Sequence, residues 1–418
     1  MRRCPALLSV TLVAVLVACT AAPHESSSPS SPEPQTPPAS AEPTGAGTPR
    51  PTLRPSSPTP VHSPAATPLA TASPTSNVID LTADAIRTVV ADGIWPHDGF
   101  AQFGPLVASV TETGIELLDL EHQTTTELYA TRRNERILSL EMSGDTVAWA
   151  VGKYDRNSRR APCDIGGGLT WRIVAHTIST GSEAEIASGR HVEVIGCAAW
   201  APTVAVDGEL VAYTVEASGP SAWEIVVRSL ESGEVVRTIA TGRVVADLDL
   251  DGMDVAYVTG VPDDPSNPYF VLSRRRLMLS VATEPEPKLV APGPSWSVSF
   301  AGGRMAWATN RESSSGQRWT ATIEDLTHVR ISDAAERVSS PRTSGSLVTF
   351  GKSSDTKSVG QIWDERTNVI YEVAPDLWME GLFSNGGWLV WYGDRYDIGN
   401  EVALVQGLPL TEVPELAE

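Results

Sequence analysis

The chain has 418 residues, of which 41% are hydrophobic, and its formal net charge at pH 7 is −20. This length is sufficient for a large hydrophobic core. The excess of acidic residues argues against nucleic acid and anionic lipid as direct partners, because both would repel the protein.

The first 18 residues, 1–18, are expected to form a signal peptide. Arg2 and Arg3 precede the apolar run PALLSVTLVAVLVA, which is too short to span a membrane as a helix. The residues LVAC, ending at Cys19, resemble the bacterial lipobox, in which the peptide is cut before the cysteine and the cysteine is lipidated. The resemblance implies a lipoprotein anchored to the bacterial cell membrane, with its folded part on the extracytoplasmic side. An ordinary secretory signal with an incidental cysteine is the alternative.

Residues 19–76 are expected to form a disordered tether. Beyond Cys19 almost every residue is Pro, Ser, Thr or Ala, and a segment of this composition cannot bury a core. Proline-rich chains are stiff and extended, so the tether would hold the folded part away from the lipid surface.

The remaining residues, 77–418, contain a glycine turn followed by an apolar strand, and this pattern recurs seven times. Examples are SGDTVAWA, DGELVAYT and DGMDVAYV. The glycines that align the units are Gly104, Gly144, Gly208, Gly252, Gly302, Gly345 and Gly387. A period of roughly 40 residues, rich in Val, Ile and Trp, predicts an all-β β-propeller of about seven four-stranded blades, with six or eight as alternatives. The segment NVIDLTADAIRTVVA before the first unit could supply a closing strand to the last blade, and the sequence leaves this open.

The repeat resembles the TolB-like and WD-type (WD40-like) propellers, in which a PDG-like turn joins the innermost strand of a blade to the second strand. The resemblance covers about residues 77–418, although the turn motif varies between units and TolB-like propellers have six blades. It implies a binding or scaffolding role more than a particular chemistry.

The connections from second to third strands are long and varied, and they lie on one face of a propeller. Binding is therefore expected on this long-loop face. Its longest segment, residues 152–168, carries Arg159 and Arg160, which could recognise an anionic partner or be solvated surface residues. Cys163 and Cys197 fall on the same face between adjacent blades, and an oxidising compartment favours a disulfide between them. Two buried free thiols are the alternative.

Four tryptophans precede the innermost strand of their units at a similar distance: Trp95, Trp200, Trp296 and Trp378. They would lie where the links between blades approach the mouth of the central channel. Aromatic rings there could stack on a sugar or hold a peptide. Alternatively, they pack neighbouring blades together.

The stretch DLDLDG, from Asp247 to Gly252, begins like a calcium-binding loop. That loop needs a bidentate acid at its twelfth position, where this chain has Val258, so no metal site is predicted. The repeat instead places the stretch on an innermost strand, with Asp247 and Asp249 on one face. We expect the two side chains to line the channel and to contact water there. Contact with a cation or a ligand is the alternative.

Motifs of catalysis are missing from the sequence, which has no nucleophile elbow, zinc-protease motif, phosphate-binding loop or dinucleotide fingerprint. No cofactor is expected, and an enzyme is not favoured. The leading hypothesis is a non-catalytic binding or scaffold module for an envelope or extracellular protein, peptide or glycan. One alternative is a propeller-type glycan-active hydrolase with carboxylates in the channel. The other is a structural subunit of an envelope complex.

Overall fold

The computed structural model describes the β-rich part of the chain. The described residues are 75–79, 85–90, 99–154, 169–191, 202–217, 223–262, 272–291, 295–312, 319–325, 331, 337–338, 341–353, 358–373, 378–397 and 400–416. The chain divides into two units, Met1–Ala66 and Thr67–Glu418, and every described residue belongs to the second. The expected signal peptide, Cys19 and nearly all of the expected tether lie outside the described residues.

Strands make up almost all regular structure in the described part. The first sheets comprise β3 (Phe100–Phe103), β4 (Leu106–Val110), β5 (Gly114–Asp119), β6 (Thr124–Ala130); β7 (Glu135–Ser143), β8 (Thr146–Tyr154), β9 (Leu169–Thr177), β10 (Ser182–His191); β11 (Val204–Asp207), β12 (Leu210–Glu216), β13 (Trp223–Ser229) and β14 (Val235–Ala240). The next comprise β15 (Val244–Asp251), β16 (Asp254–Pro262), β17 (Leu272–Ser280), β18 (Lys288–Ala291); β19 (Ser295–Ala301), β20 (Arg304–Glu312) and β21 (Trp319–Asp325). The last comprise β1 (Thr75–Ile79), β22 (Arg337–Val338), β23 (Arg342–Ser344), β24 (Leu347–Ser353), β25 (Ser358–Asp364), β26 (Val369–Val373); β2 (Arg87–Val90), β27 (Trp378–Phe383), β28 (Trp388–Asp397) and β29 (Asn400–Pro409). A short 3-10 helix, η2 (Leu410–Glu412), follows β29.

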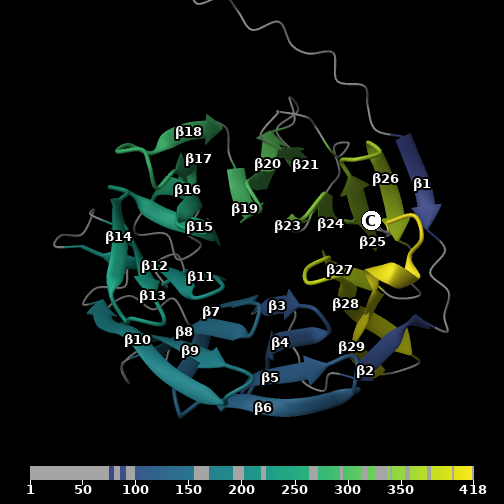
Figure 1. The fold of residues 1–418 in the computed structure, drawn as a ribbon, viewed down its shortest axis with the longest axis horizontal. Coiled ribbons are helices and arrows are strands. Elements are labelled where there is room, and N and C mark those ends of the chain that lie inside the picture. Colours follow the sequence, from purple (N-terminus) through teal and green to yellow (C-terminus); the bar gives the residue numbers. More distant parts are fainter. Residues whose placement is uncertain are drawn as a thin grey trace, which may run out of the picture. The chain divides into compact units, whose positions relative to one another are not determined.

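The sheets of the second unit stand around a common centre as the blades of a propeller, so the predicted all-β propeller fold is confirmed (Figure 1). The innermost strands are β3, β7, β11, β15, β19, β23 and β27. Among the described residues, six sheets contain four or more strands, whereas the sheet of β19–β21 contains three. The expectation of seven four-stranded blades is therefore wrong for the described residues, in which six blades have four or more strands; six was one of the alternative numbers.

Burial changes from the middle of a blade to its outer edge. In β8, every residue from Val147 to Gly152 is buried, because a middle strand has neighbouring blades against both of its faces. The outer strand β6 has no such cover on its free edge, and its residues Thr124–Glu127 are exposed. The apolar cores consequently lie between adjacent blades; one of them unites Ala101 and Val110 with Leu140 and Trp149 of the next blade.

The ring is closed by the N-terminal part of the second unit. Strand β2 pairs antiparallel with β29, so the outermost strand of the last blade comes from the segment before the first repeat. At the inner edge, the side chain of Gln102 donates to the carbonyl of Asn385 at 2.7 Å and accepts from its N–H at 3.1 Å. Strand β1 pairs in parallel with β26 as an additional outer strand. The question that the sequence left open is thus answered in favour of a closing strand.

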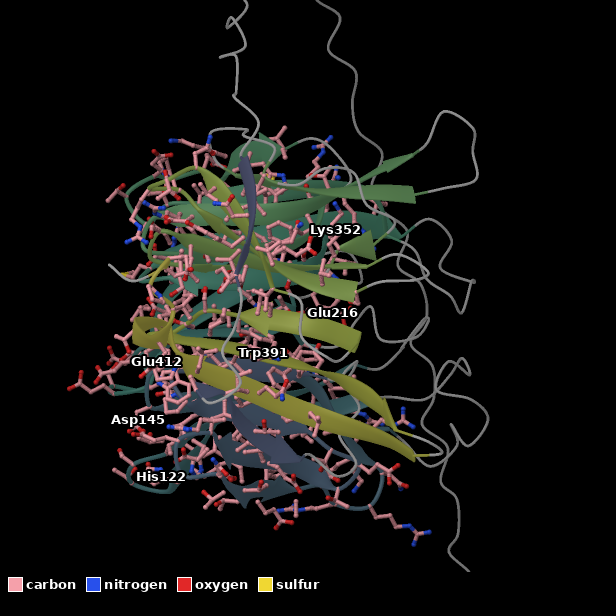
Figure 2. All side chains as sticks on the ribbon, turned by 90° about the vertical axis from the view of Figure 1, so that its right-hand side faces the viewer. His122, Asp145, Glu216, Lys352, Trp391 and Glu412 are labelled. Atoms are coloured by element: carbon pink, nitrogen blue, oxygen red, sulfur yellow. The ribbon has the colours of Figure 1, made fainter. Side chains whose placement is uncertain are left out.

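The two faces of the ring differ as the sequence predicts. Figure 2 shows Asp145, in the turn between β7 and β8, and His122, in the turn between β5 and β6, on one side. Glu216, at the end of β12, lies toward the opposite side. First-to-second turns and third-to-fourth turns therefore share a face. Of the described residues, no helix has the length and apolar character needed to cross a membrane.

The last repeat is displaced by one residue from its expected alignment. In the fourth unit, Asp251 pairs with Asp254 across a two-residue turn that starts with Gly252. In the last blade, the N–H of Trp388 donates to the carbonyl of Asn385 across the corresponding turn, which therefore starts with Gly386. The equivalent glycine in the last blade is consequently Gly386, one residue before the Gly387 used to align the repeats.

Candidate functional site

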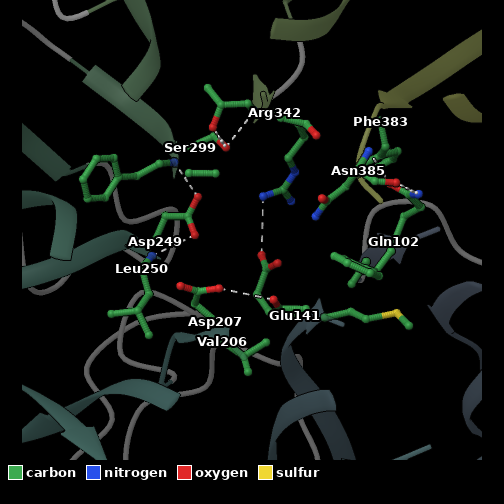
Figure 3. Close-up of a pocket in the computed structure, with 18 of the residues that line it drawn as sticks. Gln102, Glu141, Val206, Asp207, Asp249, Leu250, Ser299, Arg342, Phe383 and Asn385 are labelled. Atoms are coloured by element: carbon green, nitrogen blue, oxygen red, sulfur yellow. Dashed lines mark hydrogen bonds and ion pairs between the residues drawn. The ribbon is translucent and has the colours of Figure 1, made fainter. Parts of the chain in front are cut away.

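A cavity of about 170 Å³ lies where the innermost strands meet (Figure 3). All seven innermost strands, or the residues directly after them, contribute to its lining. Its charged side chains are Glu141, Asp207, Asp249 and Arg342, which come from different strands; Figure 3 shows Glu141 and Arg342 pointing toward each other. The lining thus contains three carboxylates and one guanidinium.

Most of the distinctive lining comes from one position of the repeat, three residues before the turn glycine. Because side chains alternate along a strand, the residue at this position projects from the same face of each innermost strand. The residues at this position that line the cavity are Ala101, Glu141, Asp249, Ser299, Arg342 and Phe383. The repeat therefore brings a mixed set of polar, charged and aromatic side chains to one level of the channel.

Arg342 lies at the start of β23 and interacts with two neighbours. Its Nη1 is 3.5 Å from Oε1 of Glu141, and both side chains are half-buried. Its guanidinium also lies 5.6 Å from the ring centroid of Phe383, within the range of a cation–π interaction. These contacts hold the positive charge on one side of the cavity.

Asp247 and Asp249 join their own strand to the next blade. Oδ2 of Asp247 accepts from the N–H of Val298 at 2.9 Å, and Oδ2 of Asp249 accepts from that of Phe300 at 2.7 Å. Oδ1 of each residue accepts from the N–H of the residue that follows it. Asp251 repeats the pattern with Gly303 at 2.5 Å. The three aspartates of DLDLDG are therefore acceptors for the backbone of β19 and of the turn that follows it.

Other innermost strands are joined by similar hydrogen bonds from a backbone N–H to a side-chain oxygen of the neighbouring strand, which we call clasps. Adjacent innermost strands do not pair with each other, so their amides need other acceptors. Oδ2 of Asp207 accepts from the N–H of Gly252 at 2.7 Å. Oγ of Ser139 accepts from that of Val204 at 3.1 Å, and Oγ of Ser299 accepts from that of Thr343 at 3.0 Å. Several hydroxyls and carboxylates of the innermost strands thus stabilise the junctions between blades.

The charged groups of the cavity perturb one another. Burial raises the pKa of the Asp249 carboxyl to about 7, and the charge of Glu141 adds to the effect. Burial likewise raises the pKa of Asp247 to about 6. Burial also raises the pKa of Glu141, against the positive charge of Arg342. Carboxyl groups with a pKa near neutrality can exchange a proton or bind a cation at physiological pH.

The described residues contain no group of three or more His, Cys, Asp or Glu side chains placed to hold a metal ion.

Only part of the predicted site belongs to the described residues. Asp247 and Asp249 lie on β15, and Asp249 lines the cavity; contact with a ligand stays a prediction. Trp296 lies on β19 and Trp378 on β27, but their side chains are not described. The predicted residues outside the described part are Cys19, Trp95, Arg159, Arg160, Cys163, Trp200 and Cys197. The predicted disulfide is therefore untested.

The sequence interpretation missed Glu141 and Arg342. Each looks unremarkable in its own unit, LSLEMSGD or SPRTSGS. Comparing one repeat position across all units would have found them, since both stand three residues before the turn glycine, as Asp249 does.

Comparison with known proteins gives a fold likeness and no family. The sequence matches no family model and no curated protein. Among solved structures, it is similar to the β-propeller domain of the Trilobed protease from Pyrococcus furiosus, with a TM-score of 0.49 and 12% identity over 79% of this chain and 97% of that one. It is also similar to an acylaminoacyl peptidase, with a TM-score of 0.48 and 13% identity over 79% of this chain and 53% of that one. A chain of the mitotic checkpoint complex gives a TM-score of 0.48 and 12% identity over 77% and 94%. These likenesses concern the fold alone.

Proposed function

We propose that this chain is a lipoprotein of the bacterial cell envelope whose propeller binds a protein, peptide or glycan without catalysis. The observation that carries the binding role is the central cavity. Six of the seven innermost strands bring polar or charged side chains to it, and Ser384 and Asn385 do so directly after the seventh. A rigid ring with a charged cavity at its centre is suited to recognition.

The anchoring part of the proposal rests on the sequence. The LVAC motif ending at Cys19, with two arginines and an apolar run before it, supports lipidation. The Pro/Ser/Thr-rich residues that follow would act as a tether between lipid and propeller. Resemblance of the repeat to TolB-like and WD-type propellers agrees with a binding or scaffold role.

The connections between strands support binding on one face. First-to-second turns are short and similar, as at Gly144–Asp145 and Gly252–Met253. The second-to-third connections differ greatly in length, and they include residues 155–168, 217–222 and 263–271. Variable connections on a constant scaffold are where proteins of this kind commonly place their recognition residues.

A glycan-active hydrolase is the second candidate, because the carboxyl groups of Glu141 and Asp249 line the same cavity. With a pKa of about 7, Asp249 could act as a general acid near neutral pH. Against this, both of its oxygens already accept backbone N–H bonds that stabilise the junction between β15 and β19. We therefore favour binding. A structural subunit of an envelope complex is the third candidate.

Anchoring is tested with the full chain expressed in a bacterial host. The wild type should partition into the detergent phase and incorporate labelled fatty acid, whereas the Cys19→Ser variant should do neither. If the Cys19→Ser variant keeps both properties, the lipid anchor is refuted.

Binding is tested with detergent-solubilised full chain on glycan and peptide arrays and with a panel of chromogenic glycosides. We expect specific retention without turnover, and about tenfold weaker retention for Trp378→Ala at unchanged thermal stability. Turnover that disappears in the Glu141→Gln variant would favour the hydrolase. Constant stoichiometric co-purification with other envelope proteins, without array binding, would favour the structural subunit.

A further inference from the structure

We propose that the central cavity binds an aliphatic ammonium group, such as the end of a lysine side chain or a small primary amine. This inference rests on the proposed binding function and assigns a ligand class to it. It is carried by the charge of the lining, by its spare hydrogen-bond acceptors and by its size.

The charge of the lining favours a cation. Three carboxylates, those of Glu141, Asp207 and Asp249, line the cavity together with a single guanidinium. That guanidinium, of Arg342, is already engaged with Glu141 and with the ring of Phe383. An additional positive group would offset the excess negative charge, whereas an anionic ligand would meet three carboxylates.

Acceptors remain available for the N–H groups of such a ligand. An ionised carboxylate offers about four acceptor positions. Asp249 uses two of them, for the N–H groups of Leu250 and Phe300. The others are available to a ligand.

Ser384 provides a second, independent indication. This residue lines the cavity and is 1% exposed, and its hydroxyl has no hydrogen-bond partner among the described residues. A buried hydroxyl without a partner is costly, at about 1–3 kcal/mol. The hydroxyl is itself enclosed, so a donor in the cavity would supply the missing hydrogen bond once the Ser384 side chain rotates toward it.

The apolar part of the lining suits a methylene chain with a charged end. Met142, Leu250, Phe103 and Phe300 line the cavity beside the carboxylates. Aromatic rings attract ammonium groups, and the apolar side chains can cover a stem. At about 170 Å³ the cavity is smaller than the roughly 300–1,000 Å³ of pockets that hold whole ligands. It therefore fits the end of a side chain or a small amine rather than a sugar ring.

Proton release should accompany binding. The ammonium group prefers ionised Asp249, whose pKa is about 7 in the empty cavity, so affinity should rise with pH up to about neutrality. If binding requires the carboxyl of Asp249 to be ionised, the affinity at pH 5 is about a hundredfold weaker than at pH 8.

The test uses full chain in detergent and n-butylammonium chloride as the probe, with binding followed by calorimetry and by saturation-transfer NMR of the probe. We expect saturable binding at pH 8 and about hundredfold weaker binding at pH 5. Butanol and butyrate, which lack the ammonium, should not compete. The Asp249→Asn variant should lose binding at least tenfold. Asp251→Asn is the matched control, because Asp251 makes the same type of backbone clasp but does not line the cavity.

A peptide carrying one internal lysine, compared with its norleucine counterpart, distinguishes a side chain from a free amine as the source. Wild-type binding that is absent at pH 8, unaffected by Asp249→Asn, or displaced by butyrate would overturn the inference. Array binding of a partner that survives these results would leave the proposed function intact, so the two failures can be told apart.

Discussion

Each oxygen of Asp249 accepts a backbone N–H, one from Leu250 on its own strand and one from Phe300 on the next blade. The same side chain lines the cavity beside Glu141. One carboxylate therefore stabilises a junction between blades and also sets the charge of the site. A protein can use an acidic residue in this way only by tolerating a raised pKa, since the carboxylate is enclosed near another carboxylate.

Stability should fall as pH rises through the range in which this group ionises. In the unfolded chain its pKa is near 3.8, whereas in the folded protein it is about 7. The folded state consequently holds the proton more tightly, and the resulting stabilisation is complete below pH 4 and lost as pH rises to about 7. A three-unit shift corresponds to about 4 kcal/mol, and we expect about 1–2 kcal/mol because the half-buried carboxyl faces the cavity.

Urea unfolding at pH 5 and pH 8 measures this effect. The loss of stability between the two values should be clearly smaller in Asp249→Asn than in wild type. Asp251→Asn controls for the loss of a backbone clasp. An equal loss in Asp249→Asn and wild type would show that Asp249 does not titrate in this range.

Individual residues of the site were predictable only where they broke the pattern of their own strand. Asp247 and Asp249 stood out because two acids on an innermost strand are unusual. Their backbone bonds to the next blade could not be predicted, since the register between two unpaired strands is not encoded in either strand alone. Glu141 and Arg342 can be recognised as residues of the site only when the ring brings them together.

At the scale of elements, the turns of the repeat were predictable and the closure was not. A glycine in the left-handed conformation, such as Gly252 with φ +57°, recurs at a fixed place before an apolar strand. The closing strand β2 has no such marker: its four residues, RTVV, resemble many short strands. Its position depends on its pairing with β29, at the far end of the chain.

Two glycines with similar backbone conformations should respond differently to alanine. Gly252 has open space around the position of a Cβ, so Gly252→Ala should cost only the strain of the conformation, about 1–2 kcal/mol. At Gly386, a Cβ would lie 2.4 Å from the backbone nitrogen of Gly104, where the first and last blades meet. Gly386→Ala should therefore cost more than about 3 kcal/mol, because neither backbone can move without opening the closure.

Urea midpoints of the two variants measure the difference. Equal destabilisation would mean that the contact between Gly386 and Gly104 contributes little to closure.

At the scale of the whole molecule, the period and composition predicted the propeller but not the size of every blade. The sheet of β19–β21 has the same inner turn as its neighbours, at Gly302, yet it contains three strands in the described part. The turn motif reports the first two strands of a blade and carries no information about its outer strand. Seven glycine turns therefore do not imply seven four-stranded blades.

The ring should unfold as one cooperative unit, because each apolar core is shared between adjacent blades. One core contains Ala212 of one blade with Val255 and Tyr257 of the next, and the closure adds the bonds between Gln102 and Asn385. If closure is as firm as other junctions, Gln102→Ala should lower the unfolding free energy by about 1–3 kcal/mol. Ser299→Ala, which removes the clasp between β19 and β23, should have a comparable effect.

Far-UV circular dichroism and tryptophan fluorescence follow the same urea titration of both variants. The two probes should give coincident midpoints, as expected for a transition without populated intermediates. Trp391 of the last blade and Trp149 of the second are both fully buried, so fluorescence reports regions on both sides of the closure. If Gln102→Ala separates the circular dichroism midpoint from the fluorescence midpoint while Ser299→Ala does not, the closure is weaker than the other junctions between blades. The last blade then unfolds before the rest. Coincident midpoints in both variants would show that a noncovalent closure couples the ends of the propeller as strongly as continuous chain couples its other blades.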